Sequence, residues 1–272
     1  MTRLPGNPAF DGKTRLRREA TPSRGADMTR AVRRPAPPVP RIADTLRIGP
    51  LPATVVALSR LGPGARAPLH REEEPLLRAL SPGRRPHFIV GRMAAARALR
   101  ALGADGPVLR DGRRPVFPAG VRGSISHCVG PIGACFASAN PRVVAVGTDL
   151  ERTDRLSWDA AHLVCTPREY DWARRARRPE SRLAVVFSAK EAVYKALSAL
   201  ETPEPVFHDV ELRVARGRLH AHVAPGLLPE HRRILGWVRL LPGGHVITSV
   251  AVISVHETGK EIPLSVQSSE VI

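Results

Sequence analysis

Residues 187–195 read Phe-Ser-Ala-Lys-Glu-Ala-Val-Tyr-Lys, and this stretch places charged groups on an otherwise apolar helical pattern. Glu191 and Lys195 are four residues apart, so on a helix they share one face. Lysine is scarce, since only four of the 42 basic residues are lysines and two of those four lie here. The ammonium group of lysine is a compact charge that can bind a phosphate or transfer a proton. The guanidinium group of arginine is planar and presents its N–H donors in a fixed arrangement. We therefore expect a helix over 183–200 whose lysines take part in chemistry.

The same stretch also has a plain structural interpretation. Ser188 and Glu191 fit a capping-box pattern, in which a hydroxyl and a carboxylate bind the first amides of a helix. Glu191 and Lys195 also fit an ordinary exposed ion pair, which contributes little stability. The residues upstream decide between the two interpretations.

A β-branched run at 143–147 predicts a buried strand, which ends in Thr148-Asp149-Leu150-Glu151. A strand has a period of two, so Asp149 and Glu151 lie on the same face. Together with Glu191 they would form a set of three carboxylates, which repel one another unless they share a cation. Mg²⁺ suits such a set, because it prefers oxygen ligands and also accepts phosphate oxygens. The residues therefore predict a magnesium site that handles a polyphosphate ester.

Composition narrows the class of protein. The chain has 272 residues, of which 43% are hydrophobic, and it carries a formal net charge of +17. This charge favours an anionic partner, which could be nucleic acid, a phosphorylated cofactor or an acidic protein. Aromatic residues make up only 4%, so stacking platforms for single-stranded nucleic acid are scarce. Three cysteines without CxxC spacing predict free thiols in a reducing compartment. No apolar run is long enough for a membrane span and no secretory signal is present, so we expect a cytoplasmic protein.

Hydrophobic patterning predicts an α+β chain in two halves. Residues 1–44 are rich in Arg, Pro and Gly, so we expect them to be disordered, and Met28 offers an alternative start. The first half, residues 45–140, should hold a strand at 54–58, a helix at 88–102 and a hairpin at 108–116. The second half, residues 141–272, should hold strands at 143–147, 208–214, 218–223, 237–241 and 245–253 around the helix at 183–200.

The motifs in this order resemble the Sfp/EntD-type 4′-phosphopantetheinyl transferases. The resemblance lies in Gly147-Thr148-Asp149-Leu150-Glu151 and in Phe187-Ser188-x-Lys190-Glu191-Ala192-x-x-Lys195, at the family's separation. Residues 91–99 and 123–127 also match, so the resemblance covers about residues 80–200. The pair of motifs GxDxE and FSxKExxxK is specific to the family. Phe187 stands where many relatives have tryptophan, as in the EntD-like branch, and the family does not require the long basic N-terminus.

The resemblance implies a function and a fold. The family moves 4′-phosphopantetheine from coenzyme A to a serine of an acyl or peptidyl carrier protein and releases 3′,5′-ADP. It implies dependence on Mg²⁺, an acidic carrier as partner, and pathways that make siderophores or other secondary metabolites. It also implies a monomer whose two similar α+β halves are related by pseudo-twofold symmetry, with coenzyme A bound in the first half and Mg²⁺ in the second.

The resemblance also implies roles for individual residues. Asp149 and Glu151 match the Mg²⁺ ligands, and Glu191 matches either a third ligand or the base that takes the proton of the carrier serine. Lys195 matches a lysine on the pyrophosphate. The other matching positions are coenzyme A contacts: Arg84 and Arg92 near the 3′-phosphate, Gly112, Arg114 and Pro115 over the adenine nucleotide, and Ser126 and His127 on phosphate.

Two other functions compete with this interpretation. A metal-dependent nuclease is favoured by the net charge and the acidic pair, but the chain lacks the lysine that such nuclease cores place two residues after the pair. A non-catalytic protein that only holds an anion is the other alternative. Intact Asp149, Glu151, Glu191 and Lys195 argue against it.

Overall fold

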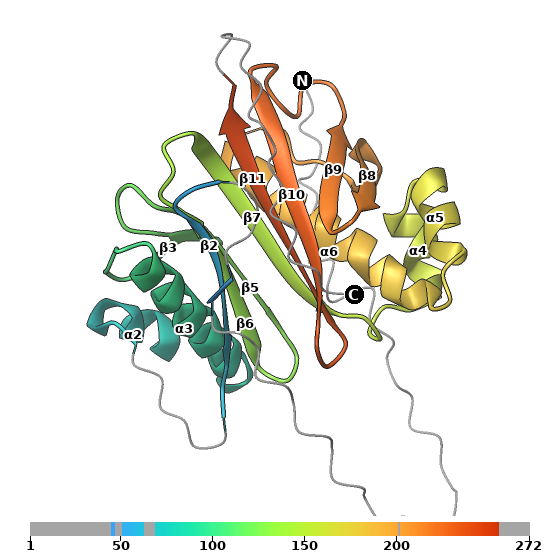
Figure 1. Ribbon diagram of the computed structural model, residues 1–272. Helices are drawn as coiled ribbons and strands as arrows, with labels where there is room; N and C mark the ends of the chain where they lie inside the picture. The colour runs from blue at the N-terminus through green and yellow to red at the C-terminus, as the bar shows by residue number, and fades with distance from the viewer. Residues whose placement is uncertain (1–44, 47–50, 63–68, 201, 256–272) are drawn as a thin grey trace, which may run out of the picture.

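The computed structural model describes residues 45–46, 51–62, 69–200 and 202–255. The predicted disorder of residues 1–44 lies outside these ranges. The described chain forms two large antiparallel sheets and one two-stranded sheet, and one long helix packs on the outer face of each large sheet (Figure 1). The predicted α+β class is therefore confirmed, whereas the pseudo-twofold symmetry and the monomeric state stay predictions.

The first half is a four-stranded sheet under one helix. Its strands, in spatial order, are β1 (Thr45–Leu46), β2 (Thr54–Arg60), β6 (Ile132–Ser138) and β5 (Arg122–Cys128). The helix is α3 (Arg85–Ala101), and Gly133 lets it approach, because a Cβ at this glycine would lie 2.4 Å from the carbonyl oxygen of Val90. The smaller elements are η1 (Arg71–Glu73), α2 (Glu74–Arg78), η2 (Pro82–Arg84), β3 (Leu109–Asp111) and β4 (Arg114–Val116).

The second half repeats this plan with five strands. In spatial order these are β7 (Val143–Arg152), β11 (His245–Ser254), β10 (Arg232–Leu241), β9 (Arg218–Val223) and β8 (Val210–Ala215). The covering helix is α6 (Pro179–Leu197), and Gly147 lies directly beneath it, since a Cβ there would be 1.9 Å from the carbonyl oxygen of Ala192. The remaining elements are η3 (Trp158–Ala160), α4 (Ala161–Val164), α5 (Pro167–Arg174), η4 (Ser198–Leu200) and η5 (Phe207–Asp209).

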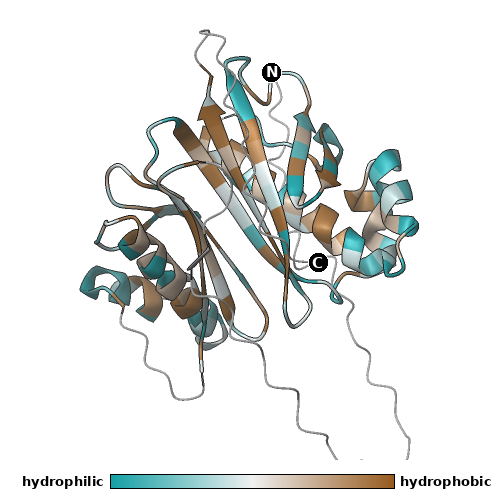
Figure 2. Ribbon diagram, in the orientation of Figure 1, coloured by the Kyte–Doolittle hydropathy of each residue, from teal (hydrophilic) through white to brown (hydrophobic). Residues whose placement is uncertain are grey.

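Buried side chains form three clusters that define four layers. One cluster lies between α3 and the first sheet, and another lies between α6 and the second sheet. The third lies between the two sheets, where Phe136 of β6 meets Trp237 of β10 with ring centroids 6.4 Å apart. Figure 2 shows hydrophobic colour along much of strands β7 and β11 and hydrophilic colour on the outer helix α2. No helix in the described ranges is both long and apolar enough to cross a bilayer.

Two local predictions need correction. The alternative interpretation of Ser188 as a helix cap is wrong, because α6 begins at Pro179, so Ser188 lies in the middle of the helix and is fully buried. The strand predicted at 143–147 continues to Arg152, because β11 pairs with it along this whole length. Asp149 and Glu151 are therefore strand residues rather than residues that follow a strand. The other predicted elements are confirmed with shifts of their ends, the largest at the strand predicted at 237–241, which begins at Arg232. Cys128, Cys135 and Cys165 are buried and form no disulfide within the described ranges.

Candidate functional site

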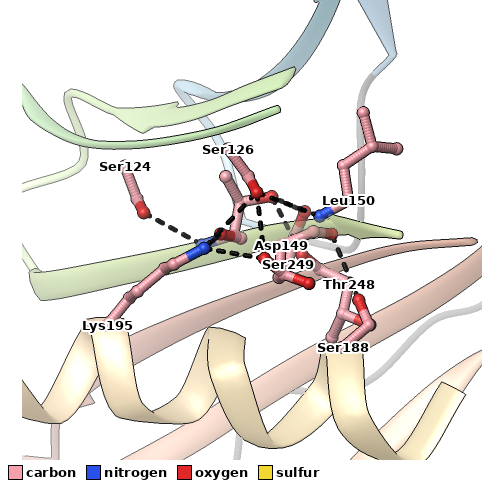
Figure 3. A network of polar contacts seen from close by, with 9 residues as sticks. Ser124, Ser126, Asp149, Leu150, Ser188, Lys195, Thr248 and Ser249 are labelled. Atoms are coloured by element: carbon pink, nitrogen blue, oxygen red, sulfur yellow. Dashed lines mark hydrogen bonds and ion pairs between the residues drawn. The ribbon is translucent and has the colours of Figure 1, made fainter. Parts of the chain in front are cut away.

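Asp149 lies at the centre of a buried polar network between β7, α6 and β5 (Figure 3). Its side chain is fully buried, and its Oδ1 atom lies 2.8 Å from Lys195 Nζ on α6. Ser126 on β5 donates a hydrogen bond of 2.9 Å to the same oxygen. Lys195 also donates to the carbonyl oxygen of Thr148 at 3.0 Å. The ammonium and the hydroxyl together compensate a carboxylate that would otherwise be costly to bury.

The local sequence explains how α6 is registered on β7. Gly147 removes the side chain that would keep the helix away from the strand. The Ser188 hydroxyl then donates to the carbonyl oxygen of Asp149 at 3.3 Å and shares a hydrogen bond of 3.1 Å with the Thr248 hydroxyl, which fixes the middle of α6 on β7 and β11. Lys195 lies two helical turns further along, so its ammonium reaches the Asp149 carboxylate.

Glu151 and Glu191 lie on the two surfaces that face each other across this contact. Glu151 is two residues after Asp149 in β7, so it shares the strand face turned toward α6, and it is buried. Glu191 is partly exposed and lies one helical turn before Lys195 on the same side of α6. No group of three or more His, Cys, Asp or Glu side chains within the described ranges is arranged to hold a metal ion.

Asp149 and Glu151 nevertheless suit Mg²⁺ as a donor set. Mg²⁺ demands hard oxygen ligands, keeps several waters, and is usually bound by one or two carboxylates together with substrate phosphates. Two carboxylates on one strand face meet this requirement without a third protein ligand. The fixed backbone of β7 between β11 and the β5 edge would hold both at a constant spacing.

Lys190 has a structural role, contrary to the expectation that both lysines of the motif take part in chemistry. Its side chain is fully buried, and its Nζ lies 2.7 Å from Glu169 Oε2. It also donates to the carbonyl oxygens of Val164 at 2.8 Å and Phe207 at 2.6 Å. Burial lowers the pKa of Lys190, while the hydrogen bond to Glu169 acts in the opposite direction. The ion pair joins α4, α5, α6 and η5.

Sequence reasoning missed the importance of Glu169. Its carboxylate binds Lys190 and accepts hydrogen bonds from the amides of Thr166 and Leu212, both at 2.7 Å. The available signal was Thr166-Pro167-Arg168-Glu169, a helix start with a carboxylate at the capping-box position. That pattern predicts the bond to Thr166 and gives no indication of a buried partner on α6.

The predicted nucleotide contacts of the first half are dispersed. Arg84 is exposed in η2, and Gly112 has φ 55° in the turn between β3 and β4. Arg114 is exposed and donates to the carbonyl oxygen of Ser198 at 3.2 Å, which brings the β3–β4 hairpin against the end of α6. Pro115 is its neighbour in β4. The hairpin thus lies beside the helix that carries Lys195.

Ser126 and His127 point to opposite faces of β5. His127 is exposed, and its ring lies 4.7 Å from that of His87 on α3, measured between centroids. Ser126 is buried and turned toward Asp149. Two consecutive strand residues always point apart, so they cannot grip one phosphate side by side.

Arg92 is mostly enclosed within the first half. It is 7% exposed, its guanidinium carbon lies 4.5 Å above the Phe88 ring, and its Nε lies 3.6 Å from Glu73 Oε1. It also donates to the carbonyl oxygen of Leu109 at 3.3 Å. Burial lowers the pKa of Arg92, and Glu73 opposes that shift. These contacts give Arg92 a role in the fold, and its contact with a 3′-phosphate stays a prediction.

Comparison with known proteins identifies relatives of both halves. Residues 72–137 match the profile of the 4′-phosphopantetheinyl transferase N-terminal domain, and residues 145–227 match that of the 4′-phosphopantetheinyl transferase superfamily. The 4′-phosphopantetheinyl transferase Svp of Streptomyces mobaraensis is 35% identical over 190 residues, which cover 66% of this chain and 77% of Svp. The 4′-phosphopantetheinyl transferase PptT of Mycobacterium tuberculosis is 36% identical over 165 residues, or 56% of this chain and 70% of PptT.

Two further matches are more distant. Enterobactin synthase component D of Salmonella typhi is 29% identical over 204 residues, which cover 71% of this chain and 82% of that protein. Among solved structures, the holo-[acyl-carrier-protein] synthase of Thermotoga maritima aligns with 41% of this chain and 64% of its own, at 20% identity and a TM-score of 0.36.

Proposed function

The chain belongs to the 4′-phosphopantetheinyl transferase superfamily, and on that premise we propose that Asp149, Glu151, Glu191 and Lys195 form its transfer site. Enzymes of this family take the phosphopantetheine group from coenzyme A and place it on a carrier protein. The observation that carries the site assignment is the contact between Lys195 on α6 and the buried Asp149 on β7. The comparisons give no support to the nuclease alternative.

We assign Mg²⁺ to Asp149 and Glu151, the two carboxylates on the face of β7 turned toward α6. When bound, Mg²⁺ supplies positive charge at the pyrophosphate oxygens of coenzyme A. Catalysis of phosphoryl transfer depends mainly on positioning and charge neutralisation, so the protein has little covalent chemistry to perform. In this proposal β7 holds the carboxylates of Asp149 and Glu151 at one fixed spacing.

Lys195 and Glu191 act from α6. Lys195 is 29% exposed, so its ammonium holds Asp149 while its positive charge still faces the place of the substrate. There it offsets the negative charge that builds on the leaving 3′,5′-ADP as the bond breaks between the attacked phosphorus and the bridging oxygen of the pyrophosphate. The carrier serine forms the new oxygen–phosphorus bond, and its proton passes to Glu191. Glu191 is alternatively a third ligand of Mg²⁺, and these two roles remain the proposal for that residue.

The first half supplies the nucleotide contacts in this proposal. Arg84, Arg114 and His127 are exposed side chains that carry or can take positive charge, and Gly112 and Pro115 shape the hairpin that lies against the end of α6. Ser126 is buried and bound to Asp149, and Arg92 is buried against Glu73 in the first half, so its contact with the 3′-phosphate stays part of the proposal. Coenzyme A would then lie across the junction of the two halves.

The partner in this proposal is an acidic acyl or peptidyl carrier domain. The net charge of +17 suits such a partner, because opposite charge speeds the encounter of two proteins. The name of one relative, enterobactin synthase component D, places that protein in the synthesis of a siderophore. We propose a carrier of siderophore or secondary-metabolite synthesis for this chain as well.

The direct test is to incubate the enzyme with coenzyme A, Mg²⁺ and an apo carrier domain and to measure intact mass. We expect the carrier to gain one phosphopantetheinyl group and 3′,5′-ADP to appear in equal amount. Chelation of Mg²⁺ or the substitution Glu151→Ala should nearly abolish the gain. A carrier panel that stays unmodified by the folded wild-type enzyme would contradict the proposal.

A further inference from the structure

The two sheets meet along β5 and β7, and each of these strands is the last of its own sheet. Across this boundary serine hydroxyls of β5, rather than backbone carbonyl oxygens, accept hydrogen bonds from amides of β7. The Thr148 amide donates to Ser124 Oγ at 3.1 Å, and the Leu150 amide donates to Ser126 Oγ at 3.2 Å. We call Ser124 and Ser126 with these two amides the serine seam. It joins the halves at the place where Asp149 lies (Figure 3).

The bonding partners of Ser126 determine where its single proton goes. A hydroxyl has one proton to donate and two lone pairs that accept. The Leu150 amide can only donate, and so can the Lys195 ammonium, whose Nζ lies 3.4 Å from Ser126 Oγ. The hydroxyl proton is therefore directed to Asp149 Oδ1, at 2.9 Å. All three positions of this hydroxyl are occupied inside the protein.

Ser124 provides a comparison within the same seam. It is buried like Ser126, lies on the same face of β5 two residues earlier, and accepts one amide of β7 in the same way. In the contacts that the structure describes, Ser124 reaches no charged side chain. The two serines thus share the structural task, and only Ser126 adds a bond to a carboxylate of the site.

We propose that Ser126 is a positioning residue that ties the orientation of the Asp149 carboxylate to the junction of the two halves. This inference rests on the proposed function, in which Asp149 holds Mg²⁺. It replaces the role that the family resemblance implied, a direct phosphate contact, because the hydroxyl has no further proton to give. The same hydroxyl thus joins the two sheets and orients the Asp149 carboxylate.

The test compares Ser126→Ala with Ser124→Ala in the full-length enzyme. Each variant leaves one buried amide of β7 without an acceptor, so both thermal midpoints should fall, and Ser126→Ala should fall further because it also removes the hydrogen bond to Asp149. With a saturating carrier, Ser126→Ala should lower kcat by roughly tenfold to a hundredfold and leave KM for coenzyme A unchanged, as expected for loss of a hydrogen bond to a charged group. Ser124→Ala should keep kcat within about threefold of wild type. Calorimetric titration with Mg²⁺ should show weaker binding only for Ser126→Ala.

Other results would overturn the inference in recognisable ways. A raised KM for coenzyme A at constant kcat would make Ser126 a direct substrate contact. If Ser126→Ala and Ser124→Ala had equal kcat and equal Mg²⁺ affinity, Ser126 would have only a structural role in the serine seam. Both results require an active wild-type enzyme, so they differ from failure of the proposed function, in which the wild type itself transfers nothing.

Discussion

Lys195 shows how one side chain links the two halves of the molecule. Its ammonium meets Asp149 Oδ1, the Thr148 carbonyl oxygen and Ser126 Oγ, at 2.8, 3.0 and 3.4 Å. These acceptors come from β7 and β5 and surround a single nitrogen. A compact ammonium with three donors fits this space, whereas a planar guanidinium is larger and presents its donors in one plane.

We therefore predict that Lys195→Arg lowers kcat by about tenfold or more although the charge is kept. Arg168→Lys on α5 is the matched control, because that exchange changes only an exposed ion pair with Glu211 and should leave kcat unchanged. Steady-state kinetics with coenzyme A and an apo carrier measure both. Full activity of Lys195→Arg would mean that a compact ammonium is not required at this position.

At the residue scale the sequence predicts which side chains are unusual but cannot assign all their roles. Lysine scarcity marked Lys190 and Lys195 equally, yet one is buried against Glu169 and the other reaches Asp149. The two residues are five apart on α6, so they point to different sides of the helix. Which side packs on β7 depends on the placement of α4, α5 and β7, which the local pattern does not contain.

At the scale of elements, each large sheet has a glycine directly beneath its long helix. Gly133 lies under α3 and Gly147 lies under α6, and in both cases an added Cβ would collide with a backbone carbonyl of the helix. Backbone cannot yield as the end of a flexible side chain can. The glycine of the GxDxE motif is thus explained by helix packing rather than by contact with a ligand.

We predict that Gly147→Ala lowers the free energy of unfolding by about 3 kcal/mol or more, because α6 must move away from β7. Gly83→Ala in η2 is the control, since a Cβ there meets open space and the change should stay within about 0.5 kcal/mol. Urea unfolding measures both values. If Gly147→Ala were as stable as Gly83→Ala, the close approach of α6 would not depend on this glycine.

Helices and strands were predicted correctly where the local sequence pattern determines them. The predictions failed where contacts with distant parts of the chain determine the length or the role of an element. The α3 and α6 helices and the β3–β4 hairpin follow from periodicity and from Asp111-Gly112. The full length of β7 does not, because its last residues are ordered by pairing with β11. Ser188 has the spacing of a helix cap, but its hydroxyl binds Asp149 and Thr248 from the middle of α6.

At the scale of the whole molecule, the proposed transfer site lies where the two helix-covered sheets meet. The order of the motifs and the family resemblance predicted the α+β halves and the convergence of α6 with β7. The serine seam and the core between the sheets had no sequence signal, because they join residues far apart in the chain. Ser126 and Asp149 are 23 residues apart, and Phe136 meets Trp237 across the two sheets.

The proposed function requires that the carboxylates of β7 hold a metal ion at this junction. Mn²⁺ can replace Mg²⁺ at oxygen sites, and its free concentration is measured by electron paramagnetic resonance. In the presence of coenzyme A, the account predicts that Asp149→Asn weakens Mn²⁺ binding by more than about tenfold relative to wild type. Asp171→Asn, which changes an exposed carboxylate on α5, should bind like wild type. Equal Mn²⁺ affinity in wild type and a folded Asp149→Asn would contradict the account.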